Sequence, residues 1–288
     1  MIIDCHVHLL PREVRTDRTS FCRSDLSFGA VYASEKARMT SENEIIEYLD
    51  RSYIDKAVVF GFPWEDHDLV AENNDAVWSF SQRWPDRVIP FAVLSPKGGE
   101  KAHRETERTL SAGFAGLGEL ATYHSGWDRE AFEELGPSLE LARAYGVPVL
   151  IHVNEPVGHN YPGKASVDFQ ALLGVIEANP DVDFILSHFG GGVFIYALMP
   201  EIGSVLARTY LDTAASPFLY DSRIFDIACR VMGSRRILFG SDYPLLPLSR
   251  YVKDLDQSGL DDELKAAILG ENAVRLFARS LRRPVTPD

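Results

Sequence analysis

The sequence predicts an α/β protein, a (β/α)8 TIM barrel that forms a single domain over residues 1–288. Short apolar runs rich in Val, Ile and Phe occur eight times, and segments with apolar residues at helical spacing separate them. Strands that alternate with helices pair in parallel through right-handed crossovers, and eight such units close a barrel. The length also suits one large barrel, and no linker, repeat or low-complexity block divides the chain.

The ends of the elements follow from local sequence signals. The eight predicted strands are residues 2–8, 56–60, 88–94, 114–120, 147–153, 183–188, 209–213 and 237–242. The predicted helices are residues 41–51, 68–84, 100–112, 129–145, 166–179 and 220–232. Ser41, with Glu44 three residues later, has the pattern of a capping box that begins a helix. Gly113 and Gly146 stand where helices commonly end in a left-handed residue.

The connections after the strands favour the barrel over its main rival. A doubly wound open sheet that binds a dinucleotide has a glycine-rich phosphate turn after its first strand. Residues 6–11 are His-Val-His-Leu-Leu-Pro instead. Two connections, residues 11–40 and 154–165, are longer than a barrel requires, and the first shows little periodicity. Such loops either build a substrate pocket at the carboxyl ends of the strands or decorate the surface.

Composition and charge predict a cytoplasmic protein that acts on small molecules. The chain is 45% hydrophobic and 25% charged, which is average for a soluble globular protein. No segment approaches the roughly 18 consecutive apolar residues of a membrane span, and the first residues lack the pattern of a signal peptide. Three cysteines argue against a disulfide framework. The formal net charge of −13 repels polyanions, so we expect neither nucleic acid nor a membrane as a partner.

Histidines and one aspartate stand at the ends of several predicted strands. Side chains alternate along a strand, so Asp4, His6 and His8 are predicted to share one face, with Cys5 and Val7 on the other. The remaining candidates end the fifth, sixth and eighth strands: His152, His188 and Asp242. A closed barrel brings these strand ends together at its mouth. Three histidines with a carboxylate suit a divalent metal such as Zn²⁺ with one position open to water.

Four segments resemble the amidohydrolase superfamily, and more narrowly the group that contains aminocarboxymuconate semialdehyde decarboxylase. The segments are Asp4-x-His6-x-His8, Ile151-His152, Leu186-Ser187-His188-Phe189-Gly190-Gly191 and Phe239-Gly240-Ser241-Asp242-Tyr243-Pro244. Residues 270–277, Gly-Glu-Asn-Ala-Val-Arg-Leu-Phe, also resemble the closing helix of that group. The resemblance extends from residue 4 to residue 277. Its motifs are specific for the fold and the metal but say little about the reaction.

The resemblance implies roles for these residues. It implies a single Zn²⁺ bound by a set of four ligands: His6, His8, His152 and Asp242. It implies that His188 is the acid, base or polarising residue beside the metal, and it makes a homodimer a fair expectation. A bound metal lowers the pKa of its water from about 15.7 towards about 7, and Asp242 would ligate the metal or accept a proton. Asp4 is either an outer partner of the ligands or a structural hydrogen-bonding residue.

Glu119 complicates the single-metal interpretation. It ends the fourth predicted strand, at the level of the histidines. In two-metal members of the superfamily a glutamate or a carboxylated lysine at this place bridges the ions, and His152 and His188 would then bind the second ion. The other interpretation is a solvated carboxylate at the rim, because only a buried unpaired carboxylate is costly.

Polar residues of the long loops are candidates for substrate contact. After the fourth and fifth strands these are Tyr123, His124, Asn154, Glu155, His159 and Asn160. In the first loop they are Arg12, Arg15 and Arg38, any of which would bind a substrate carboxylate in a bidentate way. Each of these residues also has the simpler interpretation of plain loop surface.

The leading functional expectation is a metal-dependent hydrolase that uses activated water on an amide, lactone or ester-like bond of a small molecule. The alternative is a non-oxidative decarboxylase or a hydratase of an unsaturated or aromatic acid, in which the same metal stabilises developing negative charge. A barrel that binds metal without catalysis is a third interpretation, and the complete ligand set argues against it.

Overall fold

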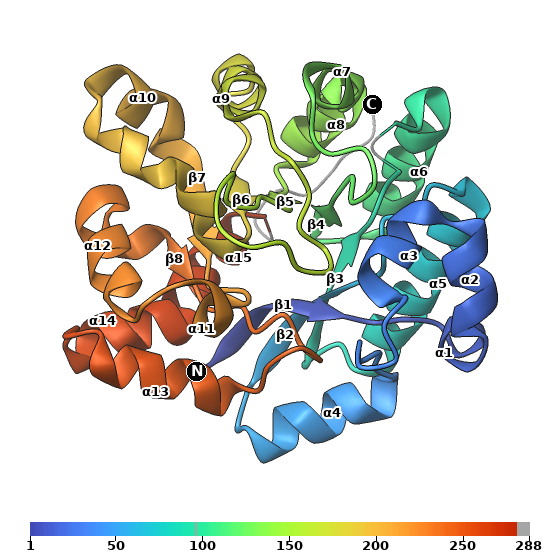
Figure 1. The fold of residues 1–288 in the computed structure, drawn as a ribbon, viewed down its shortest axis with the longest axis horizontal. Coiled ribbons are helices and arrows are strands. Elements are labelled where there is room, and N and C mark those ends of the chain that lie inside the picture. Colours follow the sequence, from blue (N-terminus) through green and yellow to red (C-terminus); the bar gives the residue numbers. More distant parts are fainter. Residues whose placement is uncertain (96, 281–288) are drawn as a thin grey trace.

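Eight parallel strands form one sheet in sequential order, from β1 to β8, in the computed structural model, which describes residues 1–95 and 97–280 (Figure 1). The strands are Ile3–His8 (β1), Lys56–Phe60 (β2), Val88–Ala92 (β3), Gly116–Leu120 (β4), Val149–Ile151 (β5), Phe184–Leu186 (β6), Thr209–Asp212 (β7) and Ile237–Leu238 (β8). The segment after β8 closes the sheet onto β1, since Cys5 N donates to Phe239 O and His8 N to Tyr243 O. The predicted (β/α)8 barrel is confirmed.

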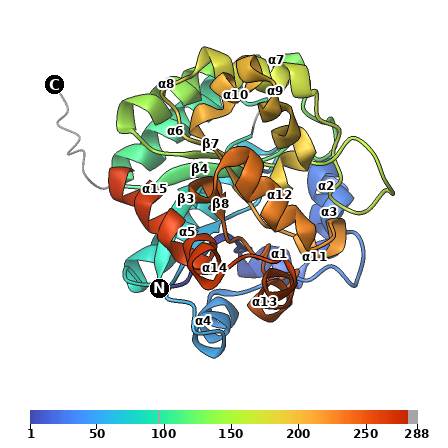
Figure 2. The ribbon, with the colours of Figure 1, turned by 90° about the vertical axis from the view of Figure 1, so that its left-hand side faces the viewer.

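Helices surround the sheet on its outer side (Figures 1 and 2). The α-helices are Arg12–Thr16 (α1), Arg18–Ser24 (α2), Leu26–Tyr32 (α3), Glu42–Arg51 (α4), His67–Arg83 (α5), Gly99–Ala112 (α6), Arg129–Glu134 (α7), Gly136–Tyr145 (α8), Phe169–Ala178 (α9), Pro200–Val205 (α10), Ser216–Leu219 (α11), Arg223–Met232 (α12), Leu248–Gln257 (α13), Asp262–Ala266 (α14) and Asn272–Ser280 (α15). Short 3-10 helices are His188–Leu198, Leu206–Arg208 and Ser234–Arg236, and a π-helical turn spans Ala267–Glu271. No helix among the described residues has the length and apolar character needed to cross a membrane.

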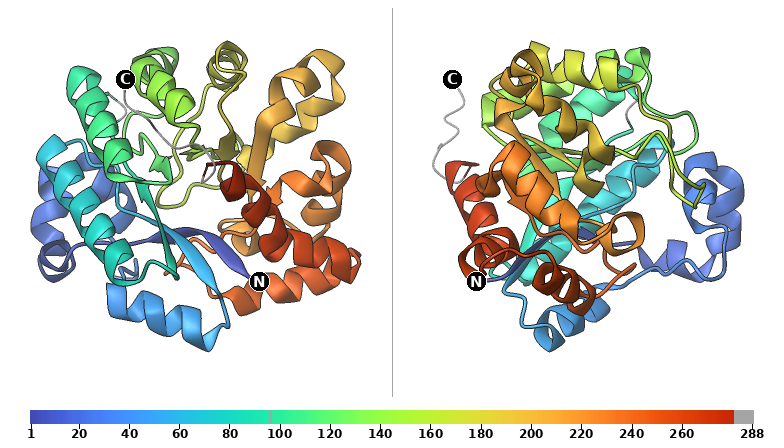
Figure 3. Two further views of the ribbon diagram at one scale, coloured as in Figure 1. Left: turned by 180° about the vertical axis from the view of Figure 1, so that it is seen from behind. Right: turned by 60° about the vertical axis from the view of Figure 1, so that its left-hand side comes forward.

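The inside of the barrel is apolar and is closed at the amino ends of the strands. Inward-facing side chains form one buried cluster, which includes Cys5, Val58, Phe60, Leu150, Ile185 and Leu238. Leu276 and Phe277 of α15 belong to the same cluster, and the Phe277 ring lies 6.0 Å from that of Phe91. The last helix therefore plugs one end of the barrel (Figure 3). The opposite end, at the carboxyl ends of the strands, is left for the site.

Most predicted elements are present, with shifted ends. The capping box of α4 is confirmed, as are the left-handed glycines Gly113 and Gly146. Residues 147–153, 183–188 and 237–242 contain shorter strands than predicted, because the chain bends into the site before it reaches His152, His188 and Asp242. The predicted helix 129–145 is two helices, α7 and α8, which meet at Leu135. The loop 11–40 contains three short helices that its weak periodicity did not reveal.

An extra residue in β1 breaks the predicted alternation of its side chains. Asp4 pairs with Ala57 and Val7 pairs with Val59, so three steps along β1 match two steps along β2. Such a bulge reverses the facing of the residues beyond it. Cys5 consequently packs inside the barrel while Val7 packs against the outer helices. The prediction that the aspartate shares a face with the two histidines of this strand is therefore wrong.

The capping box of α4 gives a test of local stability. Ser41 accepts from the backbone N–H of Glu44, whose carboxylate accepts from the Ser41 N–H at 2.8 Å. We expect Ser41→Ala to lower the free energy of unfolding by about 1 kcal/mol and the melting temperature by about 2–4 °C. Thermal unfolding followed by circular dichroism measures both. Ser52→Ala is the control, because no hydrogen bond of its hydroxyl is present among the described residues, and an equal loss there would contradict the prediction.

Candidate metal centre

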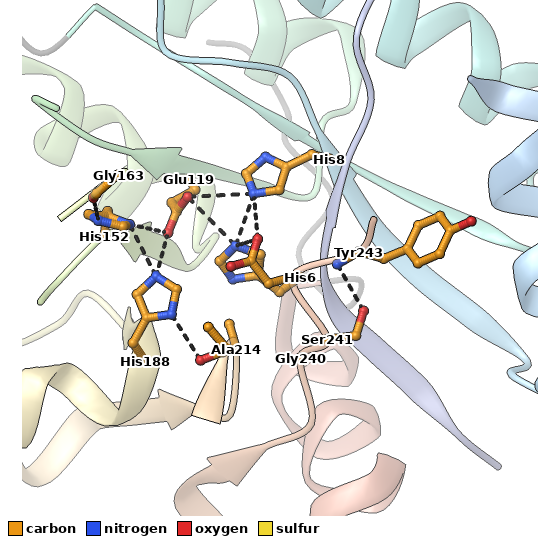
Figure 4. Close-up of polar contacts among 12 residues, drawn as sticks. His6, His8, Glu119, His152, Gly163, His188, Ala214, Gly240, Ser241 and Tyr243 are labelled. Carbon is orange, nitrogen blue, oxygen red and sulfur yellow. Dashed lines mark hydrogen bonds and ion pairs between the residues drawn. The ribbon is translucent and has the colours of Figure 1, made fainter. Parts of the chain in front are cut away.

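Six side chains converge at the carboxyl ends of the strands (Figure 4). Two come from β1, one from β4, and three from the segments that follow β5, β6 and β8: His6, His8, Glu119, His152, His188 and Asp242. His6 is fully buried and the Glu119 side chain is 1% exposed, whereas the Asp242 side chain is 17% exposed. The barrel thus brings together residues that are separated by more than 200 positions. All six were singled out by their place at predicted strand ends, and Glu119 lies inside the cluster rather than at a solvated rim.

One group of atoms has the spacing of ligands around a small cation. His6 Nε2 lies 3.3 Å from His8 Nε2, and Asp242 Oδ1 lies 3.7 Å and 3.1 Å from these two nitrogens. Glu119 Oε2 completes the group at 3.6 Å and 3.9 Å from the same nitrogens. Ligands about 2.1 Å from a tetrahedral ion lie roughly 3.4 Å apart. The four atoms therefore surround a space of the size that a divalent metal needs.

The other oxygen of Glu119 belongs to a second group. Glu119 Oε1 lies 3.0 Å from His152 Nδ1 and 3.8 Å from His188 Nε2, and these two nitrogens are 3.2 Å apart. Two triads share Glu119 and have ligand atoms within 4.8 Å of one another: Glu119 with His6 and His8, and Glu119 with His152 and His188. The carboxylate thus lies between two pairs of imidazoles (Figure 4). This is the division that the two-metal interpretation of Glu119 expected.

Outer partners fix the orientation of three of the four imidazoles. His6 Nδ1 donates to Asp212 Oδ2 at 2.8 Å, and His188 Nδ1 donates to the carbonyl of Ala214 at 2.9 Å. His152 Nε2 faces two acceptors, Asn154 Oδ1 at 2.6 Å and the carbonyl of Gly163 at 3.0 Å. A nitrogen that donates outward leaves the lone pair of the other nitrogen pointing inward, as in histidines that bind metals.

Asp212 is a residue that the sequence reasoning missed. It ends β7, is fully buried, and its second oxygen accepts from the backbone N–H groups of His188 and Ala214. The signal was available, since Asp212 ends a predicted strand just as Asp242 does. Asp212 therefore holds the imidazole of His6 in one group and the backbone of His188 in the other.

The donor set fits a divalent metal ion. Inward lone pairs of neutral imidazoles repel one another at 3.2–3.3 Å unless a proton or a cation lies between them. Two carboxylates supply compensating negative charge, and mixed nitrogen and oxygen ligands of this kind suit zinc or manganese. The inner nitrogens of His6, His8, His152 and His188, with the oxygens of Glu119 and Asp242, are the atoms that could hold it.

Charges within the cluster shift the pKa values of its members. Burial opposes ionisation of Glu119, but the imidazoles of His6 and His152 hold its pKa well below the usual range. Burial likewise opposes ionisation of Asp242, yet its contacts with His8 and His6 lower its pKa to about 2. Burial would lower the pKa of His6, but the carboxylates of Glu119 and Asp212 raise it well above the usual value. The pKa of His188 is lowered by burial and by His152, so this ring is neutral at pH 7.

The backbone is left-handed at two of the cluster residues. His188 has φ 57° and Asp242 has φ 57°, a region that residues with a side chain rarely occupy. Phe189 and the three glycines that follow it also have positive φ. Such conformations persist only where the surrounding structure holds them, and they concentrate at functional sites. Here they turn the chain sharply at the ends of β6 and β8, which aims both side chains into the cluster.

Asp4 lies outside the cluster and holds in place the segment that carries Asp242. Its carboxylate accepts from the hydroxyl of Tyr48 at 2.9 Å and from the hydroxyl and N–H of Ser241 at 2.5 Å and 2.9 Å. Burial raises the pKa of Asp4 to about 6, although these hydrogen bonds oppose the shift. Because Ser241 precedes Asp242, this network fixes the chain on which Asp242 stands. Of the two roles expected for Asp4, the structure favours the structural one.

A cavity of about 440 Å³ opens above the cluster. His8, Glu119, His152, His188 and Asp242 contribute to its floor, and Tyr32, Phe62, Tyr123, Phe218 and Leu245 are among the residues of its walls. Among the polar loop residues, Tyr123, Asn154, His159 and Arg38 line the cavity. His124 and Asn160 are exposed and do not line it, and Arg12 and Arg15 border a separate depression. Loop residues lack a periodicity that would have told these two sets apart.

Comparison with known proteins identifies the class. A family model described as Amidohydrolase matches residues 3–279, so the chain belongs to the amidohydrolase family.

Two curated relatives are decarboxylases. The 2-amino-3-carboxymuconate-6-semialdehyde decarboxylase of Dictyostelium discoideum is 23% identical over 330 residues, which cover 96% of this chain and 91% of that protein. Decarboxylase yanB of Aspergillus niger is 30% identical over 201 residues, which cover 59% of this chain and 54% of that protein.

Solved structures share the fold. The 5-carboxyvanillate decarboxylase LigW from Sphingomonas paucimobilis superposes with a TM-score of 0.77 at 16% identity, covering 96% of this chain and 98% of that one. The 5-carboxyvanillate decarboxylase of Novosphingobium aromaticivorans, complexed with manganese and 4-hydroxy-3-methoxy-5-nitrobenzoic acid, gives a TM-score of 0.75 at 18% identity, covering 96% of each chain. The manganese is a property of that protein; in this chain it is the His and Glu cluster that has the spacing of a divalent metal site.

The position of Asp212 predicts its effect on metal affinity. Asp212→Asn places an amide where one carboxylate accepts three N–H groups, so the imidazole of His6 loses its orientation. We expect the dissociation constant for Zn²⁺ or Mn²⁺ to rise about 10–100-fold, as for outer partners of metal ligands. Competition with a chromophoric chelator measures it. Asp226→Asn, in an exposed ion pair with Arg230 on α12, is the control. Unchanged affinity in Asp212→Asn would contradict this role.

Proton and metal should compete for the same cluster. Because the pKa of His6 is raised in the folded metal-free protein, the stability it contributes is present below about pH 6.5 and is lost as the pH rises through its raised pKa. A bound cation would replace that proton. The gap in melting temperature between metal-loaded and chelator-treated protein should therefore widen from pH 6.5 upward. Differential scanning calorimetry across this range checks it, and a constant gap would contradict it.

Proposed function

We propose that the protein is a metal-dependent, non-oxidative decarboxylase of a small aromatic or unsaturated carboxylic acid. The observation that carries the proposal is a metal-binding cluster at the floor of an aromatic-walled cavity, in a chain whose relatives are decarboxylases. Hydrolysis was the leading expectation from the sequence, and the relatives favour its alternative. The ligand pattern did not distinguish the two reactions, because both use the same residues around the same ion.

The cavity walls suit a flat, conjugated substrate. The rings of Phe62 and Tyr123 are stacked with their centroids 5.4 Å apart, and Phe218 and Leu245 add apolar surface around the opening. Aromatic side chains favour offset or edge contacts with another ring, which orient it without charge. The hydroxyl of Tyr123 donates to Glu119 Oε2 at 3.1 Å, so this wall is tied to the cluster. A planar acid would therefore enter with its carboxylate towards the floor.

The reaction exchanges a carbon–carboxyl bond for a carbon–hydrogen bond. The bond to the carboxylate breaks, its electron pair stays on the ring or vinyl carbon, carbon dioxide leaves, and that carbon takes up one proton. A bound divalent ion would supply positive charge for the negative charge that develops on substrate oxygens. We assign the proton transfer to Asp242, the more exposed of the two cluster carboxylates; because it is ionised, it would first take up a proton from solvent and then pass it to the carbon. His188, neutral and donating to Ala214 through Nδ1, offers the lone pair of Nε2, which would accept a hydrogen bond from a substrate hydroxyl.

We further propose that the first ion binds among His6, His8, Asp242 and Glu119, since these supply four donors at suitable separations. The second group supplies three, and an ion there would share Glu119 with the first. His152 was expected among the ligands of a single ion; its proximity to Glu119 and His188 supports a place in this second group instead. Zn²⁺ is our expectation from the imidazole-rich set. Elemental analysis of purified protein would tell one ion from two, and zinc from manganese.

The decarboxylase proposal predicts a defined product. Incubating metal-loaded protein with a panel of hydroxybenzoic and unsaturated dicarboxylic acids should release carbon dioxide. In D₂O the product should carry one deuterium at the vacated carbon, because the proton comes from solvent through an acid. Gas release and mass spectrometry measure these outcomes. A parallel panel of esters, lactones and amides would show hydrolysis instead, and protein inert on both panels would support a non-catalytic barrel.

The assigned roles predict which side chains are needed. Asp242→Asn should lower the rate of carbon dioxide release about 10²–10⁴-fold, which is the usual contribution of a positioned acid or base. His188→Gln should also lower the rate, because a contact with the substrate is lost. Metal content must be measured for each variant, so that loss of proton transfer is separated from loss of the ion. Asp226→Asn is the matched surface control. A metal-loaded Asp242→Asn protein with the wild-type rate would refute the assignment of the proton transfer.

A further inference from the structure

The loop between β5 and α9, residues 154–165, projects beyond the carboxyl ends of the strands. It crosses the barrel mouth in Figure 1 and lies on the same side of the molecule as α2 and α3 in Figures 2 and 3. His159, Tyr161 and Gly163 line the cavity from this loop. Both acceptors of His152 Nε2, the side chain of Asn154 and the carbonyl of Gly163, also belong to it. The loop therefore contacts the cavity and the metal cluster at once.

The ammonium group of Lys164 contacts three other residues of the loop. Lys164 Nζ lies 3.1 Å from Glu155 Oε1 and donates to the carbonyls of Val157 at 2.5 Å and His159 at 3.1 Å. The side chains of Lys164 and Glu155 are only 12% and 16% exposed. Removing one partner of such a sheltered pair leaves a charge without compensation. The pair therefore holds both halves of the loop in one arrangement.

A directed series of hydrogen bonds connects this pair to the cluster. A carboxylate can only accept, so the hydroxyl of Tyr161 donates to Glu155 Oε2 at 3.0 Å. The same hydroxyl then accepts from Asn154 Nδ2 at 2.9 Å. Asn154 must consequently turn its oxygen to the other side, where it accepts from Ala165 N at 2.8 Å and from His152 Nε2 at 2.6 Å. With Nε2 donating, Nδ1 is the nitrogen that faces Glu119 at 3.0 Å: it donates to this carboxylate when protonated and offers its lone pair inward when a cation replaces that proton.

We propose that Glu155 and Lys164 are a positioning pair, which acts through Tyr161 and Asn154 to present His152 Nδ1 to the metal cluster. The charge of Glu155 sets the direction of every hydrogen bond in the series. Lys164 holds Glu155 and keeps the carbonyl of Gly163 in place beside the same imidazole. The inference rests on the proposed metal centre, because it assigns to His152 an inward-facing ligand nitrogen. It does not depend on which reaction the centre performs.

Binding of Zn²⁺ alone tests the proposal without reference to activity. We expect Lys164→Met, Glu155→Gln and Tyr161→Phe each to raise the dissociation constant for Zn²⁺ about tenfold or more, the lower end of the effect of outer partners. Tyr161→Phe is the sharpest variant, since it interrupts the series while leaving both charges of the pair. Its metal-free melting temperature should stay close to the wild-type value. In ¹⁵N-histidine-labelled, Zn²⁺-loaded protein, the His152 signals should no longer show a single ligated Nδ1.

Three further variants control the experiment. Lys265→Met removes a lysine that pairs with Asp256 and Asp262 on the surface, and it should leave Zn²⁺ affinity unchanged. Lys164→Arg keeps the charge and should restore most of the affinity. His152→Gln removes the proposed ligand itself. It identifies the NMR signals of His152 and gives the loss of Zn²⁺ affinity expected when this ligand is absent. Wild-type affinity and an unaltered His152 spectrum in Tyr161→Phe and Glu155→Gln would overturn the proposal. A wild-type protein that binds no Zn²⁺ or Mn²⁺ would instead refute the metal centre.

Discussion

The arrangement of the site depends on keeping a carboxylate charged where water hardly reaches it. The Glu119 side chain is 1% exposed, and a buried charge without partners costs several kcal/mol. Its two oxygens face different pairs of imidazoles, one carried by β1 and the other by the segments after β5 and β6. The four rings therefore share the compensation of one negative charge, together with any cation that binds. Substituting any one of them changes the charge balance of both pairs, so the cluster behaves as a unit rather than as a sum of ligands.

The two pairs are held by different kinds of structure. Asp212, at the end of β7, binds the ring of His6 and the backbone of His188, so it belongs to the rigid wall of the barrel. His152 is held by the loop that follows its own strand. A site supported by strands on one side and by a loop on the other can keep its ligands in place while its opening changes. Loops of this kind commonly carry substrate selection in barrels, whereas the strand ends carry the chemistry.

The sequence was sufficient for the fold and for most of the cluster, because both follow from periodicity. Apolar runs of strand length located the strands, and polar residues at their ends located His152, His188 and Asp242. The division of the cluster around Glu119 did not follow from periodicity, since it depends on the order and tilt of strands around a closed sheet; only the resemblance to two-metal members of the superfamily suggested it. The helices α1 to α3 were missed because each is five to seven residues long and shows no sustained apolar face. Among loop residues, nothing local distinguished those that face the cavity from those that face solvent.

The extra residue in β1 has a structural consequence for the whole first motif. On a regular strand, the acid at position 4 would point into the barrel with the histidines and would compete for their protons. Because the bulge lies beyond it, Asp4 instead faces outward, where it joins the first strand, the helical layer at Tyr48 and the segment after the last strand at Ser241. Residues 4–8 thus supply two ligand candidates, His6 and His8, and also the carboxylate of Asp4, whose hydrogen bonds connect β1 to the segment after β8. Grafting the same five residues onto a strand without a bulge would transfer the histidines without the hydrogen bonds of Asp4 that help to close the barrel.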